Sequence, residues 1–158
     1  MYYDHFETGV IGCLTLVADE AGLRRIDFQT DAKNAPRREN GKKNPAFFAE
    51  AKAQLRAYFK RERKRFDLPL APEGTEFQLR VWRALQAIPY GDLASYQAIA
   101  AAAGNPRAAR AAGAACGKNP IPIIIPCHRV VGSDGSLTGF GGGLAVKQRL
   151  IDLERTRV

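Results

Sequence analysis

The segment 95–119 (SYQAIAAAAGNPRAARAAGAACGKN) constrains the fold of this chain more than any other stretch. Ser95 is a favourable cap for a short helix, and Gly104 suits the left-handed position that follows a helix end. Asn105 is then predicted to cap a second helix whose first position is Pro106. A helix, a tight glycine turn and another helix together form the helix-turn-helix pattern. The segment therefore predicts a helix-turn-helix.

The second of these helices is unusually thin. Between residues 108 and 115 all side chains but one are alanine or glycine, and the exception is Arg110. An ordinary helix is about 10–12 Å across and the DNA minor groove about 6 Å wide, so a thin helix enters that groove more deeply. Arg110 would then reach into the base stack with planar, cationic contacts. The alternative is a helix kept small for close packing against a neighbour, and the segment alone favours neither interpretation.

A linker divides the chain into two predicted domains. The stretch 67–74 (DLPLAPEG) contains two prolines and a glycine. We expect an N-terminal α/β scaffold domain over residues 1–72 and a helical C-terminal domain over residues 73–158. Thr75 and Gln78 form a capping box, which predicts a helix from there to about Ile88.

The N-terminal domain shows a mixed pattern of strands and one helix. Residues 9–28 alternate partly between apolar and polar side chains, which predicts two short strands joined by a turn at 19–22. Residues 30–45 are polar with proline, asparagine and glycine, and we expect a loop there. Residues 46–64 have apolar side chains at helical spacing, which predicts one helix with a basic end.

Composition narrows the class of protein and its partners. The chain of 158 residues has net charge +8, and its second half, from Gly74, holds ten basic and five acidic residues. Such a basic, acid-poor half suits a polyanion partner, although a basic surface kept for solubility is the alternative. Neither a signal peptide nor a membrane span is expected. Three irregularly spaced cysteines argue against a disulfide framework and indicate the reducing cytoplasm.

The run IPIIIPCHRV places Cys127 at the end of the most apolar stretch of the chain. Pro126 stiffens the approach to the thiol, because its ring fixes the backbone. His128 and Arg129 add a base and a fixed positive charge, which we expect to lower the pKa of Cys127. The other two cysteines have no such neighbours, and we expect them only to pack. Cys127 is therefore the candidate nucleophile.

A base and an acid are needed to assist this thiol. Adjacent side chains of an extended chain point to opposite faces, so we expect His128 to act on Cys127 through a bridging water. An acid on the far side of the imidazole would fix its tautomer, and the downstream candidates are Asp134, Asp152 and Glu154.

These residues resemble a known family. The signature PCHRV, preceded by NPIPIII and followed by GFGGGLAVKQRLIDLE, closely resembles the O6-alkylguanine-DNA alkyltransferases, also called methylated-DNA–protein-cysteine methyltransferases. The resemblance covers about Thr75–Glu154 strongly and the N-terminal part in outline. It implies an α/β (α+β) protein, with a ribonuclease-H-like N-terminal domain that has an antiparallel sheet, followed by a helical domain with a helix-turn-helix. It also implies that the protein flips O6-alkylguanine out of duplex DNA and transfers the alkyl group irreversibly to its own cysteine, once per molecule.

The resemblance implies a role for five residues in the reaction. Cys127 matches the acceptor nucleophile and His128 the base that takes its proton through water. Glu154 matches the acid behind the histidine. Asn119 matches the asparagine that stabilises the active-site turn. Tyr96 matches the tyrosine that helps rotate the nucleotide and supplies a proton to the departing guanine.

Further positions are implied to bind DNA and the damaged base. Arg110 matches the arginine that fills the gap left by the flipped base. The DNA-binding set is completed by Tyr96, Gln97, Asn105 and Ser133, and the positions expected to line the base pocket are Pro122, Val130, Phe140 and Gly141. Phe140 departs from relatives that have tyrosine there, so its ring can only pack.

Partners and cofactors follow from the same resemblance. The partner is double-stranded DNA bearing O6-alkylguanine, with O4-alkylthymine as a second candidate lesion, and we expect a monomer without membrane association. No cofactor is expected. Some relatives bind zinc in the N-terminal domain, but His5 and Cys13 are too few ligands for a tetrahedral site, so no metal is expected.

Three other functions fit the sequence less well. A recognition module for alkylation damage would replace the cysteine, often by tryptophan, and Cys127 argues against it. A transcription regulator would need base-reading side chains on its recognition helix, where this chain has alanines. A thiol hydrolase would need an oxyanion hole, for which the sequence offers no independent sign.

Overall fold

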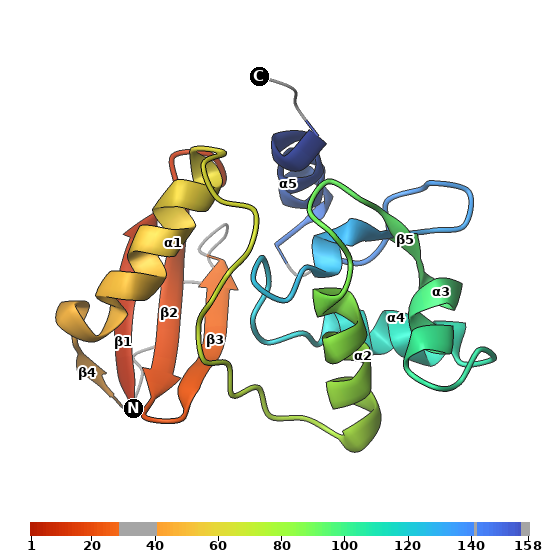
Figure 1. Cartoon of the computed structure of the whole chain (residues 1–158), viewed down its shortest axis with the longest axis horizontal. Helices are drawn as coiled ribbons and strands as arrows, with labels where there is room; N and C mark the ends of the chain where they lie inside the picture. The colour runs from red at the N-terminus through yellow and green to blue at the C-terminus, as the bar shows by residue number, and fades with distance from the viewer. Residues whose placement is uncertain (29–40, 141, 156–158) are drawn as a thin grey trace. The chain divides into compact units, whose positions relative to one another are not determined.

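The computed structural model describes residues 1–28, 41–140 and 142–155, which form two compact units, Met1–Pro72 and Glu73–Val158 (Figure 1). The first unit combines a sheet with one helix, and the second is mainly helical. In the part of the chain that the structure describes, no helix has the length and apolar character needed to cross a membrane. The predicted fold class, a mixed α/β unit followed by a helical domain, agrees with this architecture.

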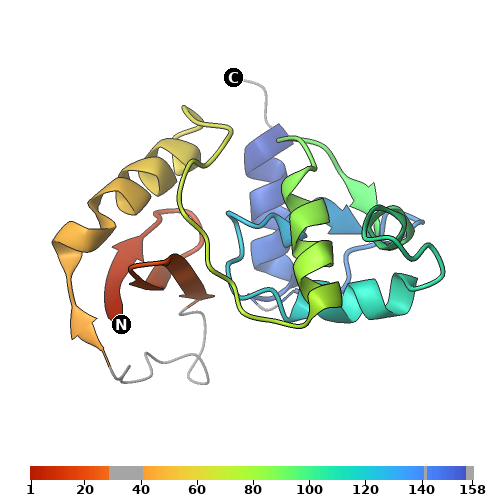
Figure 2. The same cartoon turned by 60° about the horizontal axis from the view of Figure 1, so that its bottom comes forward.

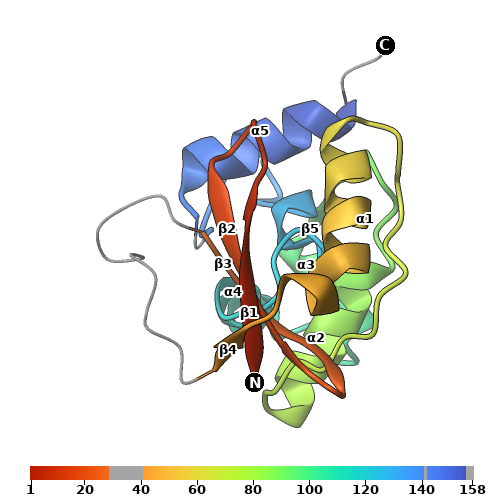
Figure 3. The ribbon, with the colours of Figure 1, turned by 90° about the vertical axis from the view of Figure 1, so that its left-hand side faces the viewer.

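The first unit is built on a four-stranded sheet of order β3-β2-β1-β4. The antiparallel strands are β1 (Tyr2–Glu7), β2 (Cys13–Asp19) and β3 (Gly22–Phe28), and the two-residue β4 (Lys42–Lys43) pairs in parallel with β1. The helix α1 (Ala49–Phe59) packs beside this sheet, as Figure 3 shows. Strand β2 is buried along most of its length and forms the centre of the unit.

Strand β1 was not predicted from the sequence. Its buried positions are Asp4 and Phe6, and the carboxylate of Asp4 forms an ion pair with Lys52 of α1. A buried charge on the inward face breaks the apolar alternation that identifies a strand. The turn at 19–22 is confirmed. Most of the predicted loop 30–45 lies outside the described residues, but Lys42–Lys43 is a strand rather than a loop.

The predicted helix 46–64 is shorter than expected. It starts with a 3-10 turn, η2 (Pro45–Phe48), and α1 ends at Phe59. Arg61 has φ 61°, and the amides of Arg61 and Glu62 bond to the carbonyls of Tyr58 and Ala57 at 3.0 and 2.9 Å. This is a Schellman motif, which ends a helix by filling its last carbonyls. The basic cluster 60–65 therefore follows the helix instead of forming its last turns.

The predicted linker is partly held in the first unit. Leu23 of β3 donates to the carbonyl of Pro69 at 2.9 Å and accepts from the amide of Ala71 at 2.8 Å. Gly22 permits this approach, because a Cβ at that position would lie 2.4 Å from the Pro69 carbonyl oxygen. Residues 69–71 thus extend along β3 and are not a free connection.

The second unit begins with the predicted capping box. Thr75 accepts from the amide of Gln78 at 3.1 Å, and the Gln78 side chain accepts from the amide of Thr75 at 2.9 Å. The helix α2 (Glu76–Gln86) follows. Its Trp82 is buried and donates from Nε1 to the carbonyl of Ala115 at 2.9 Å, which connects α2 to α4.

The helix-turn-helix segment forms with one correction. Helix α3 (Tyr96–Ala102) is capped by Ser95, and Gly104 has φ 94°, as predicted. Helix α4 (Ala109–Gly117) starts later than expected, because Asn105 caps a turn, accepting from the amide of Arg107 at 3.2 Å, and not the helix. In Figure 2, α3 is seen nearly end-on while α4 lies across the view, so the two helices cross steeply.

The alanines of α4 lie on two different faces. Ala112 and Ala115 are buried against the core that contains Trp82, whereas Arg110, Ala111 and Ala114 are exposed. The small residues of one face allow close helix packing. The small residues of the other face leave Arg110 projecting from a nearly smooth surface. The close-packing interpretation therefore applies to the buried side of the helix, and entry into the minor groove stays a prediction for the exposed side.

The rest of the second unit surrounds the PCHR signature. Cys127–Arg129 form a 3-10 turn, η3, and the short strand β6 (Val130–Val131) pairs in parallel with β5 (Ala94–Ser95). The last element, α5 (Leu144–Arg155), turns most of its large apolar side chains inward. Its buried positions also include two charged residues, Lys147 and Glu154.

Candidate active site around Cys127

The loop that leads to Cys127 is closed by Asn119. The amide nitrogen of Asn119 donates to the carbonyl of Ile125 at 2.8 Å, and its oxygen accepts from the amide of Ile121 at 3.0 Å. Inside this loop Ile123 has φ 74°. A β-branched residue in that region costs about 1–3 kcal/mol, and such strain is typical of functional sites. Asn119 thus closes the loop that leads to the thiol, and its role in the reaction stays a prediction.

Cys127 is buried and starts a tight turn instead of continuing an extended chain. Its amide donates to the carbonyl of Ile125 at 2.8 Å, and the backbone amide of Arg129 donates to the carbonyl of Pro126 at 3.0 Å. The expectation that Cys127 and His128 point to opposite faces of a strand is therefore wrong in its premise, since η3 is helical. The bridging water stays a prediction.

The electrostatics at Cys127 differ from the expectation. Burial raises the pKa of the thiol to about 11, against a hydrogen bond from Asn119 and the positive charge of Lys147, which lower it. The prediction that His128 and Arg129 lower this pKa is wrong. Burial outweighs the charges nearby, and the Arg129 guanidinium is bonded elsewhere. The resting thiol is therefore protonated at neutral pH and needs a base.

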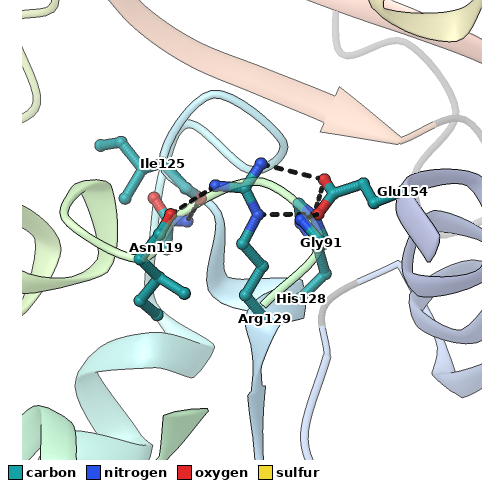
Figure 4. A network of polar contacts seen from close by, with 7 residues as sticks. Gly91, Asn119, Ile125, His128, Arg129 and Glu154 are labelled. Atoms are coloured by element: carbon teal, nitrogen blue, oxygen red, sulfur yellow. Dashed lines mark hydrogen bonds and ion pairs between the residues drawn. The ribbon is translucent and has the colours of Figure 1, made fainter. Parts of the chain in front are cut away.

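Glu154 is the centre of a buried charge cluster (Figure 4). Arg129 donates from Nε to Oε1 at 2.8 Å and from Nη2 to Oε2 at 3.1 Å, and its Nη1 donates to the carbonyl of Ile88 at 2.7 Å. The amide of Gly91 adds a contact of 3.3 Å to Oε1. Burial raises the pKa of Glu154, but the hydrogen bonds and charges of His128 and Arg129 outweigh it and hold the pKa at about 2. The carboxylate is ionised.

This carboxylate fixes the tautomer of His128. The imidazole Nε2 lies 2.5 Å from Oε2 of Glu154, and the ring is completely buried. Since the carboxylate can only accept, Nε2 carries the hydrogen and Nδ1 carries the lone pair. Within the described residues Nδ1 has no hydrogen-bond partner. Burial lowers the pKa of His128, so the ring is neutral and its Nδ1 is free to take a proton.

Of the three acids considered for His128, the structure brings only Glu154 to it. Asp134 caps the turn at Ser136, whose amide it accepts at 3.0 Å. Asp152 accepts from Gln148 of the same helix at 2.8 Å. Both of these are exposed, whereas Glu154 is buried.

A second cluster joins Tyr96 to the loop after β6. The Tyr96 hydroxyl donates to the carbonyl of Thr138 at 3.1 Å and accepts from the Thr138 hydroxyl at 2.9 Å. Lys147 of α5 donates from Nζ to the same carbonyl at 2.8 Å, and its Nζ lies 5.9 Å from the centre of the Tyr96 ring. Tyr96 is therefore tied to this loop and not to Cys127.

The other candidate residues divide by exposure. The four expected to contact DNA, namely Gln97, Asn105, Arg110 and Ser133, are all exposed. Of the four expected to line the base pocket, Pro122 and Val130 are buried and Phe140 is half-buried. Gly141 lies outside the described residues. The exposed group lies on or beside α3, the turn, α4 and the loop after β6.

Sequence reasoning missed Lys147 and Thr138. Lys147 is completely buried, and a signal for this was present, because residues 147, 150, 151 and 154 share one face of α5. A lysine on a stripe that also holds Leu150 and Ile151 is almost never fully buried without a polar partner. Thr138 had no signal, since it lies in an irregular loop and its contacts come from two distant helices.

Acid should destabilise the fold through Glu154. An unfolded chain protonates this carboxyl near its ordinary pKa of 4.5, whereas the folded protein keeps it ionised to about pH 2. The contribution is complete above pH 4.5 and is lost as the pH falls from 4.5 to 2, with a total on the order of 3 kcal/mol. His128 also contributes to the loss of stability as the pH falls below 6.5. Its pKa is lowered in the fold, so the unfolded chain takes up the proton first.

The free energy of unfolding from denaturant titrations at several pH values measures this effect. Glu154→Gln should be less stable at pH 7 and should show a weaker pH dependence between 4.5 and 2, because the titrating group is gone. Equal pH dependence of the two proteins would contradict the assignment.

No group of three or more His, Cys, Asp or Glu side chains in the described residues is arranged to hold a metal ion. The three cysteines are free thiols.

Family models match both units of the chain. Residues 1–72 match the ribonuclease-like domain of 6-O-methylguanine DNA methyltransferase, and residues 76–156 match its DNA-binding domain. The chain belongs to the 6-O-methylguanine DNA methyltransferase family. The family resemblance inferred from the PCHRV signature is thereby confirmed.

Individual relatives agree with this family over the full length. The methylated-DNA–protein-cysteine methyltransferase of Methanosarcina acetivorans is 50% identical over 154 residues, which cover 98% of each chain. The crystal structure of the Mycobacterium tuberculosis O6-methylguanine methyltransferase is 44% identical with a TM-score of 0.91, and covers 99% of this chain and 94% of its own. A structure of the Mycobacterium tuberculosis protein OGT in complex with DNA has a TM-score of 0.90 and 44% identity, with coverage of 98% and 93%. The predicted fold class and enzyme class, a methylated-DNA–protein-cysteine methyltransferase, are confirmed.

Proposed function

We propose that this protein repairs double-stranded DNA by transferring the alkyl group of O6-alkylguanine to the sulfur of Cys127. The observation that carries the proposal is the buried charge relay beside the thiol. Glu154 holds His128 with the Nδ1 lone pair unpaired, next in the chain to a cysteine whose own pKa keeps it protonated. Such a thiol is a nucleophile only when a base removes its proton.

The reaction would proceed by direct displacement. The thiol proton passes to Nδ1 of His128, through one water, and the Cys127 sulfur attacks the alkyl carbon. The new S–C bond forms as the C–O6 bond breaks, and the electron pair of the broken C–O6 bond stays on the guanine oxygen. Tyr96 donates its phenolic proton to the departing guanine, and the proton on His128 is later returned to the phenolate through solvent. Guanine is restored and the thioether remains, so each molecule acts once.

The charge cluster suits this proton transfer. A positive imidazole is stabilised by the Glu154 carboxylate at 2.5 Å, which stays ionised because Arg129 binds both of its oxygens. Lys147 supports the sulfur anion, since its positive charge lowers the pKa of Cys127. The relay would therefore stabilise both charges that form when the proton moves.

The exposed surface of the second unit would bind the DNA. Arg110 projects from a smooth face of α4. The other exposed candidates lie on α3 (Gln97), in the turn before α4 (Asn105) and in the loop after β6 (Ser133). We propose that α4 enters the minor groove and that Arg110 occupies the gap left by the everted base. Pro122, Val130, Phe140 and Gly141 would contact the base.

A transfer assay tests the function. The protein is incubated with a duplex carrying labelled O6-methylguanine, and the intact mass and the modified peptide are measured. We expect one methyl group per chain, on Cys127. A parallel duplex with O4-methylthymine tests the second lesion. Tight binding without transfer would favour a damage-recognition module and contradict the proposal.

Arg110→Ala should slow repair of duplex DNA by about tenfold or more, because the unstacking that accompanies base flipping costs a few kcal/mol. The reaction with the free modified base should be nearly unchanged. Arg110→Lys is the matched control, since it keeps the charge and loses the planar guanidinium. Equal losses on duplex and free base would contradict a role in flipping.

We further propose that the protein is a monomer in the cytoplasm. The three free thiols, Cys13, Cys116 and Cys127, are consistent with a reducing compartment. Sedimentation in the absence of DNA tests the oligomeric state, and a stable dimer would overturn it.

A further inference from the structure

We propose that Thr138 is a positioning residue that holds the Tyr96 hydroxyl for proton donation to the leaving guanine. The inference deepens the proposed function and rests on the role given there to Tyr96. It comes from the geometry of one exposed threonine that contacts two functional side chains from different helices.

Thr138 engages the Tyr96 hydroxyl on both sides. Its carbonyl accepts the phenolic hydrogen at 3.1 Å, and its own hydroxyl donates to the phenolic oxygen at 2.9 Å. Two such contacts fix both the position of the oxygen and the direction of its hydrogen. A tyrosine held only by its ring could still shift its oxygen through the Cα–Cβ torsion and turn its hydroxyl hydrogen about the C–O bond.

Lys147 makes this arrangement releasable. Its Nζ donates to the Thr138 carbonyl at 2.8 Å, so this oxygen has two donors, one from Lys147 and one from Tyr96. When the phenolic hydrogen turns toward a bound base, the carbonyl still has a charged partner. The charge-assisted hydrogen bond from Lys147 therefore keeps the Thr138 carbonyl in place while the phenolic hydrogen is turned toward the base.

The Thr138 hydroxyl stays bonded during that turn and assists the transfer. Burial raises the pKa of Tyr96, and the hydrogen bond from Thr138 acts in the opposite direction. A donor to the phenolic oxygen stabilises the phenolate that proton donation leaves behind. Thr138 therefore acts through Tyr96 and not on the substrate.

Packing supports the same placement. Tyr96 lies over Gly113 of α4, where an added Cβ would be 3.6 Å from the ring, and Lys147 lies 5.9 Å from the ring centre. The ring is thus bounded by α4 and by a cation, while its hydroxyl is bounded by Thr138. Thr138 itself is exposed, so replacing its side chain removes little core packing.

A double-mutant cycle tests the proposal. The rate constant of methyl transfer from an O6-methylguanine duplex is measured for Thr138→Val, Thr138→Ser, Tyr96→Phe and the double variant Y96F/T138V. We expect Thr138→Val to be about tenfold slower and Thr138→Ser to be close to the wild type, because serine restores the hydroxyl. In the Tyr96→Phe background Thr138→Val should add nothing.

The outcomes separate this proposal from the reaction itself. Suppose that Tyr96→Phe is slow. If Thr138→Val is then as fast as the wild type, or if it slows the Tyr96→Phe protein by a further tenfold, Thr138 does not act through Tyr96. The inference then fails while the proposed function stands. If Tyr96→Phe reacts normally, the proton donor is wrong and the inference falls with it. Reactivity of Cys127 toward a small thiol reagent should be equal in Thr138→Val and the wild type, and a large loss there would indicate a collapsed loop and overturn the positioning role.

Discussion

Cys127→Ser should abolish alkyl transfer, with no detectable methylated protein after prolonged incubation with damaged duplex. A serine hydroxyl is far less acidic and less nucleophilic than a thiol, and the buried site already disfavours the anionic form of the cysteine. The substitution replaces one sulfur by oxygen and changes no charge, so folding and DNA binding should persist. Intact-mass spectrometry and a filter-binding assay measure the two properties separately.

Cys116→Ser provides the matched control for this experiment. Cys116 is also buried, and burial raises its pKa to about 12, so it shares the environment of Cys127 without its neighbours in the relay. We expect Cys116→Ser to accept one methyl group as the wild type does. Methyl transfer to Cys127→Ser, or its loss in Cys116→Ser, would show that the acceptor has been assigned to the wrong sulfur.

The helix-turn-helix half of the fold was predictable because its signals are local. Capping by Thr75, Gln78 and Ser95, and the left-handed Gly104, each depend on residues within one turn of each other. The late start of α4 was not predictable from the same rules, because an asparagine caps a turn as readily as a helix. Local chemistry identified the boundary region but not which of two local structures forms.

The first unit was less predictable because its decisive contacts are distant in sequence. The inward-facing Asp4 of strand β1 forms an ion pair with Lys52 of α1, and the linker residue Leu70 forms a β-bridge with Leu23. Neither pairing has a periodic signature. The same reason explains Thr138, whose partners Tyr96 and Lys147 come from separate helices.

The charge assignments at the site could be predicted only in part. The pairing of His128 with Glu154 followed from the family resemblance, whereas Arg129 was expected from its place in the sequence to act on the thiol. In the fold Arg129 binds Glu154 on both oxygens, and Lys147 is the cation that acts on Cys127. Adjacency in sequence does not decide which partner a long side chain reaches. The consequence is a neutral resting thiol instead of a preformed thiolate.

That consequence leads to the second large effect, expected for His128→Gln. With a pKa of about 11, Cys127 is a thiolate in roughly one molecule in ten thousand at pH 7, so removing the base should slow transfer by about 10²–10⁴-fold. The rate constant of the variant should rise about tenfold per pH unit between pH 7 and 9, because hydroxide then ionises the thiol. The wild type should be nearly flat over this range, since burial keeps His128 neutral and ready to accept a proton.

The pH slope separates loss of the base from loss of the fold. An unfolded fraction lowers the amount of protein methylated but does not change the rate constant of the folded fraction. Asp152→Asn, an exposed change on the same helix as Glu154, is the control and should keep the wild-type rate and slope. If His128→Gln is as flat with pH as the wild type, the imidazole does not take the thiol proton. The thiolate would then have to arise without the relay, with Lys147 as the remaining cation able to stabilise it.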